Sequence, residues 1–166
     1  MRETIVDRAY AKTLLPPRKE DGHKGDFGKL LVLGGSVGYT GAPYLAASAA
    51  VHSGCGLVYL GVPESIWAVE AQKCVSAMPF PLPETDGRLC LAALDKMQDK
   101  LKGCDVLALG PGLGRGKETE QLVHALLWQV KEPLVLDADG LNAAARLLAE
   151  GGAFPHPAGE LIVTPH

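Results

Sequence analysis

The chain has 166 residues, of which 47% are apolar and 21% charged, and its formal net charge is −3. This length suits a single domain with a substantial hydrophobic core, and the small negative charge gives no reason to expect a nucleic acid or an anionic membrane as partner. No apolar run is long enough to span a membrane, and the first ten residues lack the apolar region of a secretory signal, so we expect a cytoplasmic protein.

The cysteines show no pattern of a metal site or a disulfide framework. They are widely spaced and form no Cys-x-x-Cys pair, so we predict free thiols that act as small packing residues. The four are Cys55, Cys74, Cys90 and Cys104.

Residues 1–28 are predicted to form a leader, with a short helix within Arg2–Leu15 that ends at Pro16-Pro17. From residue 29 onward, short apolar strands alternate with helices. The expected strands are Lys29–Leu33, Leu57–Val62, Val75–Pro79, Asp105–Leu109, Leu134–Leu136 and Glu160–Thr164. The expected helices are one capped by Thr40 that runs to about Ser53, then Glu64–Lys73, Leu91–Leu101, Glu118–Val130, and one capped by Asp139 or Gly140 that runs to Leu148. Residues 79–83, with three prolines, are expected to form a loop.

Strands that are apolar throughout and separated by helices indicate an α/β fold with a mainly parallel sheet covered on both faces. Right-handed crossovers then place every strand-to-helix turn at one edge of this sheet. Open sheets of this kind bind ligands beyond the carboxyl ends of their strands, so the turns after the strands are the candidate site.

The first such turn spans residues 34–42, Gly-Gly-Ser-Val-Gly-Tyr-Thr-Gly-Ala. Its glycines let a ligand approach the backbone, and the amides of the following helix favour an anionic or polar group. Its spacing fits neither the G-x-G-x-x-G fingerprint nor a P-loop, and Ser36 lacks the flanking glycines of a nucleophile elbow. A tight turn without a ligand explains this segment as well as a binding site does.

The second turn spans residues 110–114 (Gly-Pro-Gly-Leu-Gly). Its three alternating glycines present backbone without side chains to a ligand at the end of a strand. We interpret it as ligand-binding rather than as a loop of unusual backbone angles. Arg115 after it could contact a phosphate or could simply be solvated.

Asp137 and Asp139 flank Ala138 at a third strand end. Alternation along an extended chain would send both carboxylates to one side, where they could hold Mg²⁺ through water or orient a hydroxyl group. The alternative is that Asp139 caps the next helix while Asp137 accepts hydrogen bonds from backbone amides. Asn142 is interpreted first as structural.

The histidines differ in their positions. His166 follows the last strand, where ligand contact is expected, and His23, in the loop before the first strand, could reach the same crevice. His52 and His124 lie on predicted helices and are expected to be structural. No Ser-His-Asp arrangement is evident.

Five segments in register carry a resemblance to a known family. Together they resemble the NAD(P)H-hydrate dehydratases, the carbohydrate-kinase-like proteins of the ribokinase superfamily, over about His23 to His166. The segments are residues 23–29 (HKGDFGK), 34–43 (GGSVGYTGAP), 110–114 (GPGLG), 136–142 (LDADGLN) and 164–166 (TPH).

The resemblance implies a ribokinase-like three-layer α/β/α fold and a metabolite-repair lyase. Such an enzyme dehydrates NAD(P)H hydrate back to NAD(P)H with ADP or ATP, and Mg²⁺ neutralises the phosphate charge. Ala42, Gly112 and His166 match the family's contacts with the hydrate. Further contacts are predicted at Gly41, Gly114, Asp137, Asp139 and Asn142.

The family also has a C-terminal portion that binds the nucleotide and supplies the catalytic aspartate. No segment of this chain matches that C-terminal portion. The resemblance therefore implies that residues 29–166 are the N-terminal part of such a domain, without a catalytic, nucleotide-binding or metal-binding residue of its own. We expect this chain to be inactive alone, with the missing C-terminal portion as a separate partner. Since the last strand would then be an exposed edge, we also expect homo-oligomers or aggregation.

Three other functions stay open. The same fold could serve a kinase of a vitamin precursor or sugar, because fold does not fix chemistry. The chain could also be a non-catalytic module that binds a dinucleotide. A conventional dehydrogenase, with Glu64 as the ribose-binding acid, is the weakest alternative because the glycine fingerprint is missing.

Overall fold

The computed structural model describes residues 5–15, 17–18, 20–154 and 159–165. The described helices are α1 (Arg8–Leu14), α2 (Gly41–His52), α3 (Glu64–Lys73), α4 (Ala93–Lys102), α5 (Lys117–Gln129) and α6 (Ala138–Ala149), with a short 3-10 helix η1 (Lys24–Phe27). The described strands are β1 (Lys29–Leu33), β2 (Leu57–Pro63), β3 (Met78–Leu82), β4 (Glu84–Thr85), β5 (Arg88–Leu89), β6 (Val106–Leu109), β7 (Leu134–Asp137) and β8 (Leu161–Thr164).

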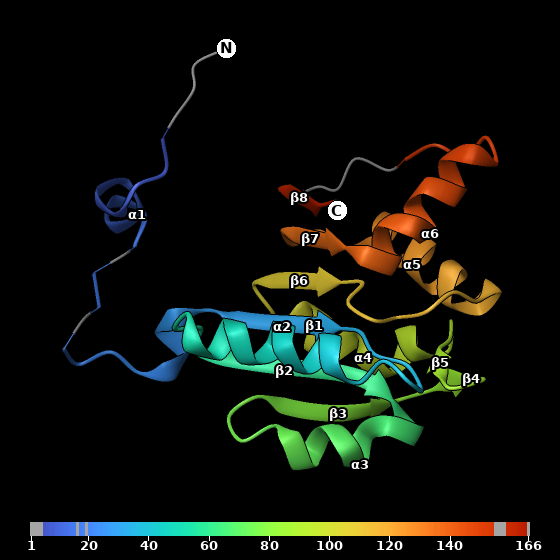
Figure 1. Ribbon diagram of the computed structural model, residues 1–166, viewed down its shortest axis with the longest axis horizontal. Helices are drawn as coiled ribbons and strands as arrows, with labels where there is room; N and C mark the ends of the chain where they lie inside the picture. The colour runs from blue at the N-terminus through green and yellow to red at the C-terminus, as the bar shows by residue number, and fades with distance from the viewer. Residues whose placement is uncertain (1–4, 16, 19, 155–158, 166) are drawn as a thin grey trace.

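Six of these strands form one sheet in the order β3-β2-β1-β6-β7-β8 (Figure 1). Every pairing in this sheet is parallel. From β1 the chain continues to β2 and β3 on one side, whereas from β6 it continues to β7 and β8 on the other. The α/β fold with a mainly parallel sheet, predicted from the sequence, is confirmed.

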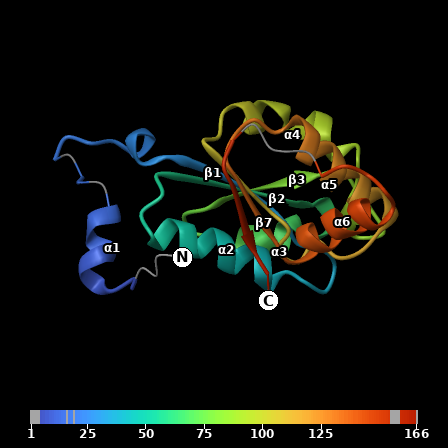
Figure 2. The ribbon, with the colours of Figure 1, turned by 90° about the horizontal axis from the view of Figure 1, so that it is seen from above.

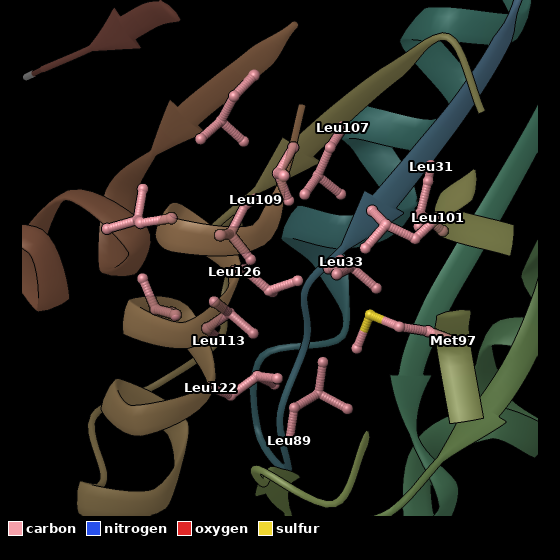
Figure 3. Packing of buried hydrophobic residues seen from close by; sticks show 14 of the residues in the cluster. Leu31, Leu33, Leu89, Met97, Leu101, Leu107, Leu109, Leu113, Leu122 and Leu126 are labelled. Carbon is pink, nitrogen blue, oxygen red and sulfur yellow. The ribbon is translucent and has the colours of Figure 1, made fainter. Parts of the chain in front are cut away.

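Helices cover both faces of the sheet (Figure 2). Alternation along the strands separates two clusters, since Leu31 and Leu33 of β1 point to one face and Val32 points to the other. We call the side covered by α4, α5 and α6 the leucine face, because leucines fill most of its cluster (Figure 3). We call the side covered by α2 and α3 the alanine face; its cluster comprises Val32, Ala47, Val58, Leu60, Val62, Ile66 and Ala77.

The segment after α3 differs from the sequence prediction. Residues 79–82 were expected to lie in a loop, but they belong to β3, which begins at Met78 rather than Val75. Pro79 and Pro81 are tolerated because β3 is an edge strand that pairs only with β2, so a missing backbone N–H does not interrupt the sheet.

A small antiparallel hairpin, β4–β5, was missed altogether. Asp86 and Gly87 connect its strands with φ angles of 51° and 72°, the backbone of a two-residue type I′ turn. An Asp-Gly pair is a strong hairpin signal, so the sequence did contain this information. Helix α4 consequently begins at Ala93, two residues later than predicted.

The N-terminal segment packs little against the sheet. Helix α1 is capped by Asp7, whose side chain accepts a hydrogen bond from the Tyr10 amide at 2.8 Å, and buries none of its residues. Arg18 attaches the segment to the domain, since it donates to the Gly54 carbonyl at 2.9 Å and lies over the Phe27 ring at 4.4 Å.

Two further findings concern the chain as a whole. All four cysteines are free thiols. Among the described residues, no helix has both the length and the apolar character needed to cross a membrane.

Candidate functional site

The carboxyl ends of the parallel strands bring the glycine-rich turns together. Strands β1 and β6 are neighbours, and the connections that leave them run to opposite sides of the sheet. Such a reversal of strand order opens a crevice between the two outgoing turns, where open α/β sheets bind their ligands. Here those turns are residues 34–42 and 110–114.

The two turns are bonded directly to each other. The Gly35 amide donates to the Pro111 carbonyl at 2.8 Å, and the Ser36 hydroxyl donates to the Gly112 carbonyl at 2.8 Å. A Cβ atom on Gly34 would lie 2.4 Å from the Pro111 oxygen, so glycine is required at this position for the two backbones to approach. Ser36 therefore has a structural bond and is not an activated nucleophile.

Gly112 lies directly against the start of α2. Its φ is +67°, and a Cβ atom placed on it would come within 3.0 Å of the Tyr39 carbonyl oxygen and 3.4 Å of the Ala42 Cβ. Gly41 and Ala42 are exposed at the first turn of α2. The structure thus brings Ala42 and Gly112, from segments 70 residues apart, close together beyond the carboxyl ends of β1 and β6.

Asp139 supports the second turn rather than capping a helix. It lies in the first turn of α6, where its carboxylate accepts from the Gly114 amide at 2.9 Å and from the Asn142 side chain at 3.1 Å. Arg115 approaches the same carboxylate at 3.9 Å but is largely exposed. The prediction that Asp139 or Gly140 caps α6 is therefore wrong, because α6 already begins at Ala138 and Asp137 is its N-cap residue.

Asp137 has a different partner. It is the N-cap residue of α6, makes no side-chain cap bond, and accepts from the Thr164 hydroxyl of β8 at 2.6 Å. The expected alternation between Asp137 and Asp139 fails because Ala138 has a φ of +44° and already begins the helix. The two carboxylates serve separate contacts, one with β8 and one with the second glycine turn.

In the described part of the chain, no group of three or more His, Cys, Asp or Glu side chains could hold a metal ion. Both carboxylates nearest the crevice already accept hydrogen bonds from protein groups.

The histidines divide into three groups. His156 and His166 lie outside the described residues. His23 precedes η1 and the start of β1, at the amino ends of the strands, so the prediction that it could reach the crevice is wrong. His52 and His124 hydrogen-bond to the backbone oxygens of Ser48 and Ala143 at 2.7 and 2.9 Å, which agrees with structural roles.

Sequence reasoning missed two residues near the crevice. Arg88, on the unpredicted hairpin, forms a backbone bridge with Ser36 and lies against Gly114, where an added Cβ would be 2.9 Å from its Nε atom. Glu70, on α3, is completely buried. The Asp86-Gly87 pair could have revealed the position of Arg88, whereas no local pattern distinguishes Glu70 from the exposed glutamates of other helices.

Comparison with known proteins decides the family. The model of the carbohydrate-kinase family described as NAD(P)H-hydrate dehydratase matches residues 30–166. The chain belongs to the NAD(P)H-hydrate dehydratase family. This membership agrees with the resemblance carried by the five sequence segments.

Curated members of the family align with nearly the whole chain. A bifunctional NAD(P)H-hydrate repair enzyme of Moorella thermoacetica is 43% identical over 98% of this chain and 30% of its own length. An ADP-dependent (S)-NAD(P)H-hydrate dehydratase of Lactiplantibacillus plantarum is 35% identical over 99% of this chain and 54% of its own length. The chain thus spans about half the length of that dehydratase, and less of the bifunctional enzyme.

A solved structure of the family shares the fold. The ADP/ATP-dependent NAD(P)H-hydrate dehydratase of Bacillus subtilis, co-crystallised with ATP and Mg²⁺, is 28% identical with a TM-score of 0.69, over 95% of this chain and 51% of that one. The ribokinase-like architecture expected from the resemblance is confirmed.

Proposed function

We propose that this chain forms the substrate-binding part of an ADP- or ATP-dependent NAD(P)H-hydrate dehydratase, which repairs NADH and NADPH. The observation that carries the proposal is the contact between Gly112 and the α2 turn at Ala42, at the strand reversal, in a member of this family. Residues 29–166 would then be the N-terminal part of a ribokinase-like domain, and residues 1–28 its leader.

The crevice suits a flat, uncharged ring beside polar groups. Because Gly112 has no side chain, its backbone lies directly against the start of α2, so a nicotinamide ring could contact both backbones while the first amides of α2 bind an oxygen of the hydrate. Asp139 holds the Gly114 amide and so fixes the shape of the second turn. We propose His166, from the match to the family segment, and Asn142 as further contacts with the hydrate, while Asp137 anchors β8 through Thr164.

The reaction needs the hydrate hydroxyl to become a better leaving group. The hydroxyl would give its proton to the catalytic aspartate while its oxygen attacks the terminal phosphorus of the nucleotide, which would form a phosphate ester and release AMP from ADP or ADP from ATP. The C–O bond then breaks with its electrons on the phosphate, assisted by the ring nitrogen lone pair, and loss of a proton from the adjacent carbon restores the double bond. Mg²⁺, when bound with the nucleotide, would supply positive charge to the transferring phosphate.

The proposal assigns the catalytic aspartate and the nucleotide contacts to a portion of the enzyme other than these 166 residues. We infer that this portion is a partner of the chain, that the enzyme assembles as a homo-oligomer and that it works in the cytoplasm. The exposed apolar side chains of β8, Ile162 and Val163, are consistent with such contacts. Light scattering of the isolated chain and of the longer protein would test the assembly.

The decisive experiment uses the complete reading frame that contains this sequence. NADH or NADPH hydrate is supplied with ADP or with ATP, and recovery of the reduced cofactor is followed by absorbance. No recovery with either nucleotide would contradict the proposal. Nucleotide turnover that depends instead on a hydroxylated vitamin precursor or a sugar would establish the small-molecule kinase, and tight binding of NADPH without turnover would establish the binding module.

A matched pair of substitutions tests the crevice itself. Gly112→Ala adds a methyl group where Tyr39 and Ala42 lie close, whereas Gly151→Ala adds one in open space at a similar φ of +81°. Both variants lose stability from the left-handed backbone, by about 1 kcal/mol. We expect only Gly112→Ala to weaken hydrate binding, by about tenfold or more, and equal weakening in both would contradict the assignment.

A further inference from the structure

A buried carboxylate lies behind the first glycine-rich turn. Of the buried polar side chains in the described ranges, which are Ser36, Glu70 and Thr119, Glu70 alone is ionisable, and its side chain has no exposed surface. Its Oε1 atom accepts from the Lys73 ammonium at 3.3 Å, and its Oε2 atom has no hydrogen-bond partner among the described residues. Burial raises the pKa of the Glu70 carboxyl, against the opposing effect of Lys73. Such an arrangement costs stability, so packing alone does not explain it.

Lys73 connects this carboxylate to the start of α2. Its Nζ atom donates to the Thr40 hydroxyl at 2.6 Å, to the Thr40 carbonyl at 3.0 Å and to Glu70. These three acceptors match the three N–H donors of an ammonium group. Thr40 is the N-cap residue of α2, and Lys73 is the last residue of α3.

The bond to Lys73 changes what Thr40 does at the helix terminus. An N-cap threonine usually adopts an extended backbone and accepts a hydrogen bond from an amide of the first turn. Thr40 instead has a helical backbone, with φ −87° and ψ −11°, and makes no side-chain cap bond. Because Pro43 has no amide hydrogen, the amides left without a cap are those of the exposed Gly41 and Ala42, beside Gly112.

We propose that Lys73, oriented by Glu70, is a positioning residue that withdraws the Thr40 hydroxyl from α2 and so leaves the Ala42 amide free for the substrate. This inference rests on the proposed dehydratase function, because it assigns a role at that same crevice. The bulk of the effect is on substrate binding, since neither Lys73 nor Glu70 contacts the reacting atoms.

Glu70 is needed because Lys73 has room to move. A cavity of about 260 Å³ borders Lys73 and is lined by α2 and the segment after α3, with Tyr44, Ser48, His52 and Cys74 among its residues. Without the carboxylate, the flexible lysine side chain could turn into this cavity and release Thr40. Glu70→Gln keeps an oxygen acceptor for Lys73, whereas Glu70→Leu does not.

The test is a double-mutant cycle in the protein from the complete reading frame. In Lys73→Met, Thr40 is free to adopt the extended backbone of a capping residue, and its hydroxyl then caps the Ala42 amide and competes with the hydrate. KM should therefore rise about tenfold while kcat stays within about twofold. In Lys73→Met with Thr40→Val, the competing hydroxyl is gone, and KM should return to within about threefold of the wild type. Additive losses, or a fall in kcat with KM unchanged, would overturn the proposal.

Arg146→Met provides the matched control. Arg146 pairs with Glu120 between α6 and α5, on the leucine face and away from the α2 terminus. This variant also loses one long cation from an ion pair, but KM for the hydrate should not change. A rise in KM equal to that of Lys73→Met would mean that any loss of a helix–helix ion pair has this effect, and the proposal would fail.

A second measurement separates the two proposals if the wild-type protein does not turn over the hydrate. Amide hydrogen exchange at Ala42, followed by NMR, requires no substrate. Exchange should be fast in the wild type, slower in Lys73→Met because Thr40 caps the amide, and fast again in the double variant. Equal exchange in all three would overturn the positioning role, whereas the expected pattern without turnover would leave only the dehydratase assignment wrong.

Discussion

The two faces of the sheet bury different kinds of side chain. The leucine face is filled by large residues from β1, β6, β7, α4 and α5, whereas the alanine face combines valine, leucine and isoleucine from the strands and α3 with alanines from α2, and contains Glu70 in its interior. Small side chains let α2 lie close to the sheet, and the N-terminus of α2 can then reach Gly112. The leucine face therefore supplies most of the stability, and the alanine face positions the crevice.

The largest effect should come from Leu33→Ala on the leucine face. Leu33 has no exposed surface, and removing three carbons from a well-packed core typically costs about 3–4 kcal/mol of unfolding free energy. Urea unfolding followed by circular dichroism would measure it. Leu45→Ala is the control, since Leu45 is 65% exposed, and a similar loss in both variants would contradict the account of the leucine face.

The alanine face should be sensitive to added volume instead. Ala47 of α2 is fully buried against the sheet, so Ala47→Leu must push α2 outward at a cost of about 1–3 kcal/mol. Because the α2 terminus moves with it, KM for the hydrate should rise as well. An unchanged KM together with the stability loss would show that the crevice does not depend on how closely α2 packs.

The leucine face was largely predictable from the sequence, and its elements show why. Apolar strands and the amphipathic pattern of α5 carry local signals, and the predicted β1 and α5 agree with the structure within one residue, as does α3 on the alanine face. The hairpin was missed although Asp86-Gly87 signalled it, and β3 was shifted because prolines suggested a loop. Prolines are excluded from a central strand but tolerated in an edge strand. That β3 is an edge strand is known only from the strand order of the sheet.

The crevice was predictable in its position but not in its internal contacts. Glycine-rich turns after apolar strands gave the two walls, because parallel strands end at one edge. The partners of Asp137, Asp139 and Thr40 depend on side chains from distant segments, namely Thr164, Gly114 and Lys73. No local pattern encodes such pairs, so the sequence alone does not identify the hydrogen-bond donors to the two carboxylates.

Glu70→Gln should change how stability depends on pH. Burial raises the pKa of Glu70 in the folded state above its value in the unfolded chain, so the folded state binds the proton more tightly. Its contribution to stability is therefore largest when Glu70 is protonated and is lost as the pH rises through the folded-state pKa. The glutamine variant should show a flatter stability–pH curve over this window than the wild type.

Glu150→Gln is the control for this measurement because Glu150 is exposed at the end of α6. Its curve should follow that of the wild type. A Glu70→Gln curve that also follows the wild type would contradict the prediction. It would mean that the Glu70 carboxyl has the same pKa in the folded protein as in the unfolded chain.

The smallest effect should appear in cysteine reactivity. Burial raises the pKa of the Cys104 thiol to about 11, so this buried residue should react very slowly with a thiol reagent at pH 8. Burial, and then the charge of Glu70, raises the pKa of the half-buried Cys74. Glu70→Gln should therefore accelerate labelling of Cys74 by about twofold and leave Cys104 unchanged, as mass spectrometry of the labelled peptides would show. An unchanged rate at Cys74 would mean that Glu70 carries no negative charge in the folded protein at this pH, and Lys73 would then be held by a neutral acid.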